Sequence, residues 1–300
     1  MADASEPRPL GVLAGGGALP RLVAEAERRR GGEAFIVALA GAPGDWIDAF
    51  PHTPCGLGQV GKLFSALRNA GCERVCFAGG LTRPSLGSLL RAFDATALKV
   101  AVEVFRLMRK GDDGMLRGFA EIFERRGFRL VGASELLEDL LASPGALTPR
   151  GPSETDLADI ARAAEIVAAL GAVDVGQGAV VARGRCLAVE TVQGTDAMLA
   201  RLEGDTRRAG APIPSGVIFK APKPGQDMRF DVPAVGPDTV ARAKAAGLNG
   251  VAVQVGGVFL LDPAETLEAA DREGLFVYGY EAETRPTIAD PEAPATARAP

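Results

Sequence analysis

The sequence predicts an α/β protein in which an N-terminal Rossmann-like parallel sheet is followed by a C-terminal α+β part. Through residues 1–142, short apolar stretches alternate with amphipathic helical ones, which is the pattern of strands joined by crossover helices. From residue 153 onward, pairs of short strands separated by glycine interrupt the helices and indicate hairpins. A chain of 300 residues is also longer than one hydrophobic core usually serves, so two domains are expected.

The N-terminal part begins with an apolar strand at residues 10–14, which a run of glycines turns into a helix that ends near residue 30. Glycine tolerates the backbone angles that such a tight strand-to-helix turn requires. The further elements expected here are strand 34–40, helix 58–70, strand 74–78, helices 98–109 and 114–126, strand 128–132 and helix 134–141.

The glycine run after the first strand consists of Gly15, Gly16 and Gly17. Backbone N–H groups at the start of a helix can bind an anion, so these glycines are candidates for phosphate or uridine contact; the alternative is a turn and nothing more. Pro20 occupies the last position of what would be a dinucleotide fingerprint, and no acidic residue follows the second strand. A nicotinamide dinucleotide is therefore not expected.

A second glycine pair, at residues 79–80, follows a later strand and leads to Thr82 and Arg83. Because ligands of open α/β sheets bind beyond the carboxyl ends of the strands, both glycine loops are expected to border one crevice. Thr82 and Arg83 are candidate polar contacts there. The alternative for Arg83 is an ion pair at the rim.

Residues 143–152 are rich in proline and glycine and are expected to be a linker. The division expected is an N-terminal nucleotide-sugar-binding domain (1–142), the linker (143–152), a catalytic domain (153–282) and a disordered tail (283–300). The elements expected in the catalytic domain are helix 155–170 capped by Ser153, hairpin 178–182/186–191, helix 194–202, strand 216–219, helix 238–246, hairpin 250–255/258–261, helix 264–273 and strand 275–280.

Composition excludes several kinds of function. The net charge of −5 and pI of about 5.2 argue against a nucleic-acid partner. No apolar run is long enough for a transmembrane helix, and the first residues lack the pattern of a secretory signal. The spacing of the 4 cysteines fits no zinc site, and the single histidine, His52, is expected at the surface. Any metal should therefore be bound by oxygen, which favours Mg²⁺ or Mn²⁺.

The most informative stretch is residues 217–236, where prolines and a glycine stiffen a charged loop after a short apolar strand. Lysines supply positive charge to phosphate oxygens, and aspartates supply oxygen ligands to a divalent metal. The alternative is a solvated, salt-bridged turn. The candidates for catalysis are Lys220, Lys223, Asp227 and Asp231, of which the two aspartates are also the candidate metal ligands.

Asp231 is the preferred catalytic carboxylate of the two. It stands before Val232 and Pro233, and proline restricts the residue that precedes it, so the backbone beside Asp231 is held. Asp227 is close enough to Arg229 in sequence to pair with it, and Asp227 is therefore expected to play a supporting role to Asp231.

Further polar residues stand at strand ends, at a helix start or in the same loop, and they are candidates for substrate binding. Glu190 could instead face solvent from an edge strand, and Thr195 and Asp196 could merely cap a helix. These candidates are Gln177, Glu190, Thr195, Asp196, Gln226 and Arg229.

Four sequence motifs, LGVLAGGGALP, DVGQGAVV, AVETVQGTDAML and KAPKPGQDMRFDVPAVG, occur in this order over nearly the whole chain. In these motifs the chain resembles the UDP-2,3-diacylglucosamine diphosphatases of lipid A synthesis, in the branch that is not a metallophosphoesterase. The resemblance implies a Mg²⁺- or Mn²⁺-dependent hydrolase that releases UMP and 2,3-diacylglucosamine 1-phosphate. It also implies a cytoplasmic homodimer with peripheral contact to the inner membrane and a lipid-linked nucleotide sugar as substrate. Two alternatives stay open: another nucleotide-diphosphate-sugar hydrolase or transferase, and a nucleotide-binding sensor without activity.

Overall fold

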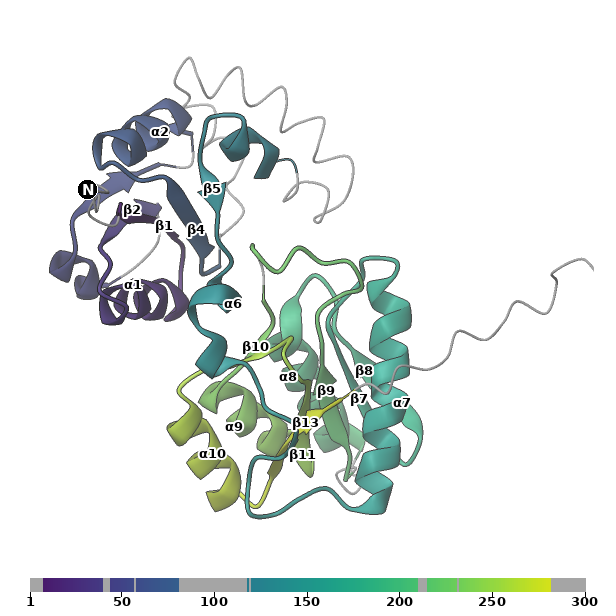
Figure 1. The fold of residues 1–300 in the computed structure, drawn as a ribbon. Coiled ribbons are helices and arrows are strands. Elements are labelled where there is room, and N and C mark those ends of the chain that lie inside the picture. The colour runs from purple at the N-terminus through teal and green to yellow at the C-terminus, as the bar shows by residue number, and fades with distance from the viewer. Residues whose placement is uncertain are drawn as a thin grey trace, which may run out of the picture.

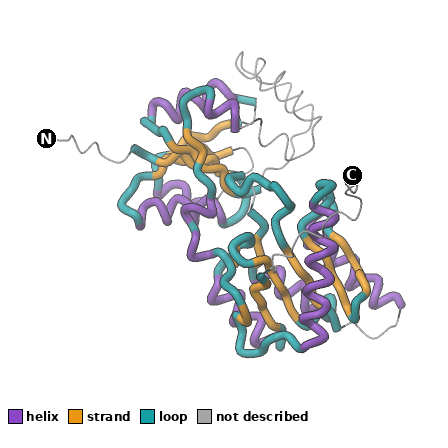
Figure 2. The backbone as a smooth tube through the Cα atoms, turned by 45° about the vertical axis from the view of Figure 1, so that its right-hand side comes forward, coloured by secondary structure: helices purple, strands orange, loops and turns teal. Residues whose placement is uncertain are grey.

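The computed structural model describes residues 8–39, 44–56, 58–80, 118, 120–209, 215–230 and 232–281, with only the backbone for 206–209. These residues form two lobes, each with a central sheet covered by helices on both faces (Figures 1 and 2). Thr82, Arg83 and Asp231 lie outside the described residues, as do the expected helix 98–109, residues 114–117 and 119 of the expected helix 114–126, and the expected tail.

The N-terminal lobe contains a 5-stranded sheet, all parallel, in the order β3-β2-β1-β4-β5. This is the predicted Rossmann-like arrangement of a mixed α/β protein. The strands are β1 (Leu10–Ala14), β2 (Ala34–Leu39), β3 (His52–Cys55), β4 (Arg74–Ala78) and β5 (Arg129–Leu130), and the helical elements between them are α1 (Leu19–Arg29), η1 (Asp45–Ala49) and α2 (Val60–Asn69).

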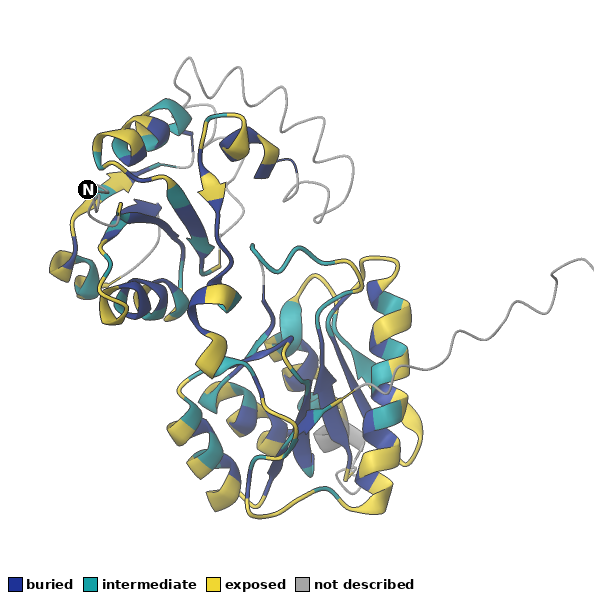
Figure 3. Ribbon diagram, in the orientation of Figure 1, coloured by how far each residue is buried: buried dark blue, intermediate teal, exposed yellow. Residues whose placement is uncertain are grey.

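Side-chain alternation along these strands explains why both faces of the sheet are covered. Leu10 and Val12 of β1 pack in the cluster that contains α1, whereas Leu13 of the same strand packs in the cluster that contains Phe64 and Leu67 of α2. Strands buried on both faces are typical of parallel sheets. Figure 3 shows the buried strands at the centre of each lobe in dark blue.

Strand β3 was not predicted, because its sequence is polar and contains a proline. Pro54 is compatible with this position because β3 lies at the edge of the sheet, where a missing N–H donor costs no ladder bond. His52 is exposed on this strand, as predicted for its side chain. The expected helix 134–141 is instead two short pieces, α6 (Ala133–Leu136) and η3 (Glu138–Leu140).

The C-terminal lobe contains a 6-stranded mixed sheet in the order β6-β13-β11-β9-β7-β8. Strands β13, β11 and β9 are parallel, whereas β6, β7 and β8 pair antiparallel with their neighbours. The elements are β6 (Gly145–Ala146), α7 (Glu154–Gly171), β7 (Gly178–Ala182), β8 (Arg185–Val189), α8 (Gly194–Ala209), β9 (Val217–Lys220), β10 (Ala234–Val235), α9 (Pro237–Ala245), β11 (Gly250–Gln254), β12 (Phe259–Leu260), α10 (Pro263–Arg272) and β13 (Phe276–Tyr280).

Helix α7 covers one face of this sheet and helices α8, α9 and α10 cover the other. Phe219 of β9 packs with α7 residues, whereas its neighbour Ile218 packs with residues of α8, α9 and α10. Ser153 caps α7 as predicted, since its hydroxyl accepts a bond from the Asp156 N–H at 3.2 Å. The predicted hairpin between β7 and β8 also forms, with Arg183 and Gly184 at positive φ in its turn.

Residues 143–152, which were expected to join the two domains, contribute to the C-terminal sheet. Gly145 and Ala146 form β6, which pairs with β13. Thr148 is buried, and its Oγ1 accepts a bond from the Val277 N–H at 3.0 Å. Proline and glycine correctly indicated a break in helical periodicity, but a two-residue edge strand leaves no periodic signal.

The predicted hairpin 250–255/258–261 is also wrong. Strand β11 lies between β9 and β13, while β12 pairs in parallel with β10 in a separate 2-stranded sheet. Two apolar runs across a glycine pair resemble a hairpin, but the sequence pattern does not specify which strands pair. Gly256 and Gly257 here turn the chain away from the large sheet.

The two lobes share apolar contacts where they meet. Val232 and Phe259 of the C-terminal part belong to the same buried cluster as Leu10 and α6 residues of the N-terminal part. Figure 1 shows α6 at the junction and the loop between β9 and β10 on the side of the C-terminal lobe that faces the N-terminal lobe. This loop is therefore in a position to connect the two lobes.

Candidate active site

One edge of the C-terminal sheet gathers most of the polar side chains that the sequence indicated. The parallel strands β9, β11 and β13 end at this edge, and the antiparallel strand β7 begins there, with Gly178 opposite Lys220. Strand β8 ends beside the start of β7, since the Glu190 N–H donates to the Gly178 carbonyl at 2.8 Å. Topology therefore brings together residues that are far apart in sequence.

The loop that follows β9 is held by packing as well as by its own prolines. Pro222 lies against Gly257, where an added Cβ would be 2.8 Å from the proline Cδ. Pro224 lies against Gly171 at the end of α7, where an added Cβ would be 2.7 Å from the proline Cδ. The two prolines thus restrict the backbone of the loop and also pack it against two other segments of the lobe.

Gln177, Lys223 and Gln226 form one polar cluster at this edge. The Gln226 Oε1 accepts from the Gln177 side-chain amide at 3.0 Å and from the Lys223 N–H at 2.8 Å. The Lys223 ammonium pairs with Asp174, whose backbone has a φ of 58°. The cluster joins two segments that are far apart in sequence, the one after α7 and the one after β9, so it depends on the folded lobe.

Glu190 and Thr195 form a second pair next to this cluster. The Thr195 hydroxyl donates to Glu190 Oε2 at 2.8 Å, and that oxygen would be 2.7 Å from a Cβ added to Gly178. Glu190 is half-buried and hydrogen-bonded, so it does not simply point into solvent. Asp196 differs from this pair, because it is exposed and lies 3.2 Å from Arg242 Nε of α9. The Asp196 side chain thus lies at the surface in an ion pair.

Lys220 ends β9 and is 7% exposed, which is unusual for a lysine. Its ammonium donates to the Ala234 carbonyl at 3.1 Å. A buried cation requires compensating polar contacts, and an anionic ligand would supply one. The position of Lys220 at the end of a strand, beside the rigid loop, suits contact with a phosphate.

Asp227 and Arg229 bind each other. The Arg229 Nε and Nη2 donate to the two carboxylate oxygens of Asp227 at 2.9 and 2.7 Å. Hydrogen bonds to Asp227 raise the pKa of the Arg229 guanidinium above its usual range. Both oxygens of Asp227 therefore face a guanidinium, which disfavours Asp227 as a metal ligand in this arrangement.

The described residues offer no metal site of the usual kind. Within residues 8–281, apart from the undescribed stretches, no group of three His, Cys, Asp or Glu side chains is placed to bind a metal ion. Asp231, the other candidate ligand, lies outside the described residues. A metal requirement thus stays a prediction from sequence.

The two glycine loops of the N-terminal lobe, at residues 15–17 and 79–80, are hydrogen-bonded to each other. Gly15 N–H donates to the Ala78 carbonyl at 2.8 Å, and Gly16 and Gly80 exchange two backbone bonds at 2.8 and 3.1 Å. A Cβ on Gly15 would be 2.6 Å from the Gly80 oxygen. The close approach of two backbones thus explains the glycine at position 15, and Gly15 and Gly16 already use their N–H groups in protein bonds. Gly17 has a φ of 91°, which favours glycine for a different reason.

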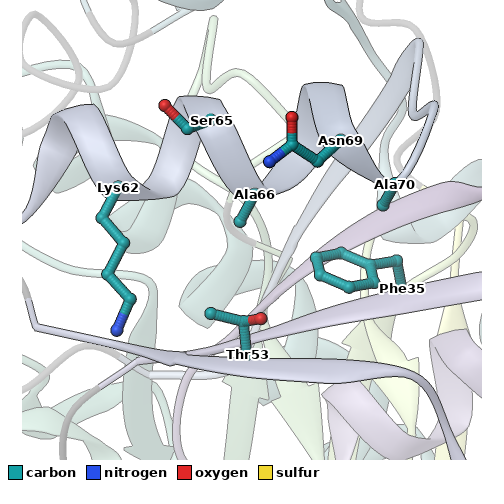
Figure 4. Close-up of a pocket in the computed structure, with 7 residues that line it drawn as sticks. All are labelled: Phe35, Thr53, Lys62, Ser65, Ala66, Asn69 and Ala70. Carbon is teal, nitrogen blue, oxygen red and sulfur yellow. The ribbon is translucent and has the colours of Figure 1, made fainter.

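Figure 4 shows a hollow between α2 and the strands β2 and β3, with a volume of about 420 Å³. Lys62 at its rim donates to the Pro54 carbonyl at 2.7 Å. None of the residues that the sequence indicated lines it. The residues drawn there are Phe35, Thr53, Lys62, Ser65, Ala66, Asn69 and Ala70.

The sequence did not single out two residues that the structure places beside candidate residues. Asp174 pairs with Lys223, and Glu124 lies 3.1 Å from Arg229 Nη1. Asp174 stands at the start of the DVGQG stretch, so its position beside Gln177 was a usable signal. Glu124 gave no signal, because its contact with Arg229 depends on how the two lobes meet.

Comparison with known proteins agrees with the arrangement of two lobes. Residues 9–140 match the LpxI N-terminal domain and residues 143–278 match the LpxI C-terminal domain. The chain is also similar to the UDP-2,3-diacylglucosamine pyrophosphatase LpxI of Caulobacter vibrioides. The two are 40% identical over 281 residues, which is 93% of this chain and 100% of the relative. With both domains matched and a relative aligned over its full length, the chain belongs to the LpxI family.

Proposed function

We propose that this protein hydrolyses the pyrophosphate of UDP-2,3-diacylglucosamine to UMP and 2,3-diacylglucosamine 1-phosphate in lipid A biosynthesis. The similarity to a relative named for this pyrophosphatase supports the proposal. The structural observation that carries it is the gathering of Gln177, Glu190, Lys220 and Lys223 at one edge of the C-terminal sheet.

Hydrolysis adds one water across the phosphoanhydride. The water oxygen bonds to one phosphorus, the bridging oxygen leaves with the other phosphate, and the water protons are released or transferred to the leaving group. Negative charge on the phosphoryl oxygens must be stabilised as this happens. Lys220 lies at the edge as a desolvated cation, and Lys223 would exchange its contact with Asp174 for the phosphate.

Asp231 is proposed as the carboxylate that positions the attacking water, with Asp227 in support. The proposal rests on the sequence, in which Val232 and Pro233 hold the backbone beside Asp231. Gln177, Gln226, Glu190 and Thr195 are proposed to bind the substrate, since they lie beside the lysines.

Dependence on Mg²⁺ or Mn²⁺ is proposed separately. The chain has many carboxylates but a single histidine, and its cysteines are not spaced as in zinc sites, so oxygen ligands are favoured. The described residues do not themselves form a metal site, so no step is assigned to a metal. Activity should disappear in EDTA and return with added Mg²⁺. Full activity in EDTA would contradict this requirement.

A cytoplasmic homodimer that contacts the inner membrane peripherally is also proposed. Val173, Val175 and Val192 have exposed fractions of 69%, 39% and 83%, and they lie on two segments next to the candidate site. Such side chains suit contact with the lipid phase from which a diacylated substrate must come. No helix in the described part of the chain is long and apolar enough to cross a membrane. Vesicle flotation and sedimentation velocity test the membrane contact and the dimer.

The proposed function is tested by assay of the purified protein on UDP-2,3-diacylglucosamine and, in parallel, on UDP-N-acetylglucosamine. We expect stoichiometric UMP from the first substrate and much slower turnover of the second. Equal turnover of both would favour a general nucleotide-diphosphate-sugar hydrolase. Tight UDP binding without turnover of either substrate, with or without metal, would indicate a sensor.

A further inference from the structure

The loop after β9 contacts the N-terminal lobe through Arg229. One guanidinium binds two carboxylates: Asp227 of the same loop, and Glu124, whose Oε1 is 3.1 Å from Arg229 Nη1. Glu124 belongs to the helical residues that precede β5 in the N-terminal lobe. The guanidinium thus connects the two lobes by charge-assisted hydrogen bonds.

Apolar contacts hold the same loop at the same place. The ring of Phe230 packs against that of Phe77 in β4, with centroids 4.9 Å apart. Gly132 approaches the Arg229 backbone so closely that an added Cβ would be 3.3 Å from the Arg229 Cα. Met228 packs against the cluster that includes β1 and α6 residues. Three consecutive residues, Met228, Arg229 and Phe230, therefore anchor the loop to the N-terminal lobe by an ion pair and by packing.

We propose that Arg229 is a positioning residue that clasps the loop 221–230 to the N-terminal lobe and so fixes Lys223 and Gln226 of the candidate site. The predicted change in kcat rests on the proposed function, whereas the contact between the loop and the N-terminal lobe does not. Arg229 donates to protein carboxylates from three of its nitrogen positions, so it acts through the loop and not on the substrate.

The chemistry of the clasp requires arginine in particular. A guanidinium presents donors on several sides and can bind two carboxylates at once, whereas the lysine ammonium is a point charge. The side chains of Arg229 and Glu124 are 38% and 50% exposed. Exposed ion pairs stabilise a fold only slightly, so loss of the clasp should change how often the loop opens more than it changes the melting temperature.

Limited trypsin digestion of the full-length protein tests the structural part, with cleavage after Arg229 measured by mass spectrometry. Glu124→Gln removes only the arm of the clasp that reaches the N-terminal lobe. We expect cleavage after Arg229 to become about fivefold faster, as for loss of one exposed ion pair. Glu121→Gln is the matched control, because Glu121 lies on the same helical stretch and its ion pair among the described residues is local, with Arg125 at 3.6 Å. The control should be cleaved like the unmodified protein.

Kinetics test the positioning part. Arg229→Gln should lower kcat by about a hundredfold, and Arg229→Lys by about tenfold, because small misplacements of the site residues slow the reaction strongly. The melting temperatures should stay close to that of the unmodified protein. Partial rescue by lysine, with kcat changing more than KM, is a result that a purely structural role does not produce.

The two parts can fail separately. Unchanged cleavage in Glu124→Gln overturns the clasp, whether or not the protein has the proposed activity. Faster cleavage together with unchanged kcat in both Arg229 variants overturns the positioning role. Absence of diphosphatase activity in the unmodified protein contradicts the proposed function and leaves the cleavage result to decide the clasp.

Discussion

The carboxyl ends of the two sheets differ in what their signature residues do. In the N-terminal lobe, Gly15 is required because two backbones approach each other, and the N–H groups of Gly15 and Gly16 donate to carbonyls of Ala78 and Gly80. In the C-terminal lobe, Gln177, Glu190 and Lys223 bring polar side chains together, although packing of the sheet does not require them there. Packing thus accounts for Gly15 in the N-terminal lobe, whereas the polar cluster of the C-terminal lobe is the part that we propose to bind the substrate.

The comparison teaches that a motif shared with a family is not by itself a catalytic motif. The glycine run was expected to expose N–H groups to an anion, but two of them are used within the protein. The charged loop was as easily interpreted as a salt-bridged turn, and Asp227 and Arg229 do pair in that way. The contacts of each residue in the folded protein are needed to distinguish a residue that the packing requires from one that can bind a ligand.

The largest effect is expected from Asp231→Ala, measured beside Asp227→Ala. Loss of a group that positions water should lower kcat by about a hundredfold or more, while substrate affinity persists because both lysines remain. Asp227 acts through Arg229, so its loss should cost about tenfold. Near-normal kcat in folded Asp231→Ala would refute the assignment. A collapse confined to Asp227→Ala would transfer the role to that residue.

In the N-terminal lobe the expected effect is on stability. Gly15→Ala places a Cβ 2.6 Å from the Gly80 oxygen, and relief of such a clash should lower the free energy of unfolding by about 1–3 kcal/mol. Gly16→Ala is the matched control, since its Cβ would lie 3.6 Å from the same atom. Urea denaturation of the two variants measures the difference. Equal stabilities would contradict the backbone-approach explanation.

Gly16→Val examines whether the glycine loop also contacts the ligand. Branched methyl groups would obstruct a ligand that approaches this backbone, so KM should rise about tenfold if phosphate or uridine binds there. A thermal melt is needed beside the kinetics, because stability could fall as well. Unchanged kcat and KM in a folded variant would restrict the loop to its role as a turn.

A smaller effect is expected from Thr195→Val in the C-terminal lobe. It removes the hydroxyl that donates to Glu190 Oε2 while it conserves volume. Loss of one such hydrogen bond should raise KM by about threefold to tenfold. Asp196→Asn, at a neighbouring position whose side chain pairs at the surface with Arg242, is the control and should leave KM unchanged. Equal effects of the two substitutions would remove the distinction between these neighbours.

The smallest perturbation is thiol labelling, which compares the accessibility of the cysteines in the two lobes. Burial raises the pKa of Cys72 to about 11 and that of Cys76 to about 12, and Cys55 is also buried. Because thiolate is the reactive form, these thiols should stay unlabelled at pH 8 in the native protein. Cys186 on β8 is exposed and should react. Rapid labelling of more than one thiol would contradict the described packing of the N-terminal lobe.

Periodicity predicted most of the fold because strands and helices with buried faces leave a pattern in the sequence. The alternation of β1, α1 and β2 and the hairpin of β7 and β8 were predicted in this way. Strands β3 and β6 were missed, because edge strands need few apolar residues and tolerate proline or glycine. The pairing of β12 with β10 was missed because strand partners depend on tertiary packing.

For the candidate site, the sequence indicated which residues could take part but not which of them contact one another. Gln177, Lys223 and Gln226 meet as a cluster, whereas Asp196 does not join it. The partnership of Arg229 with Glu124 could not be predicted, since it requires the relative placement of the two lobes. The roles of Thr82, Arg83 and Asp231 remain predictions from sequence.

We propose above all that the ligand binds at the polar edge of the C-terminal sheet, where β9, β11 and β13 end. Amide hydrogen exchange, measured with and without the product 2,3-diacylglucosamine 1-phosphate, tests it directly and needs no turnover. We expect exchange to slow by about tenfold or more in peptides from residues 174–178, 190–196 and 220–230, because ligand contacts reduce local opening. Peptides lining the hollow beside α2 should be unchanged. Protection confined to that hollow, with none at the polar edge, would contradict the claim.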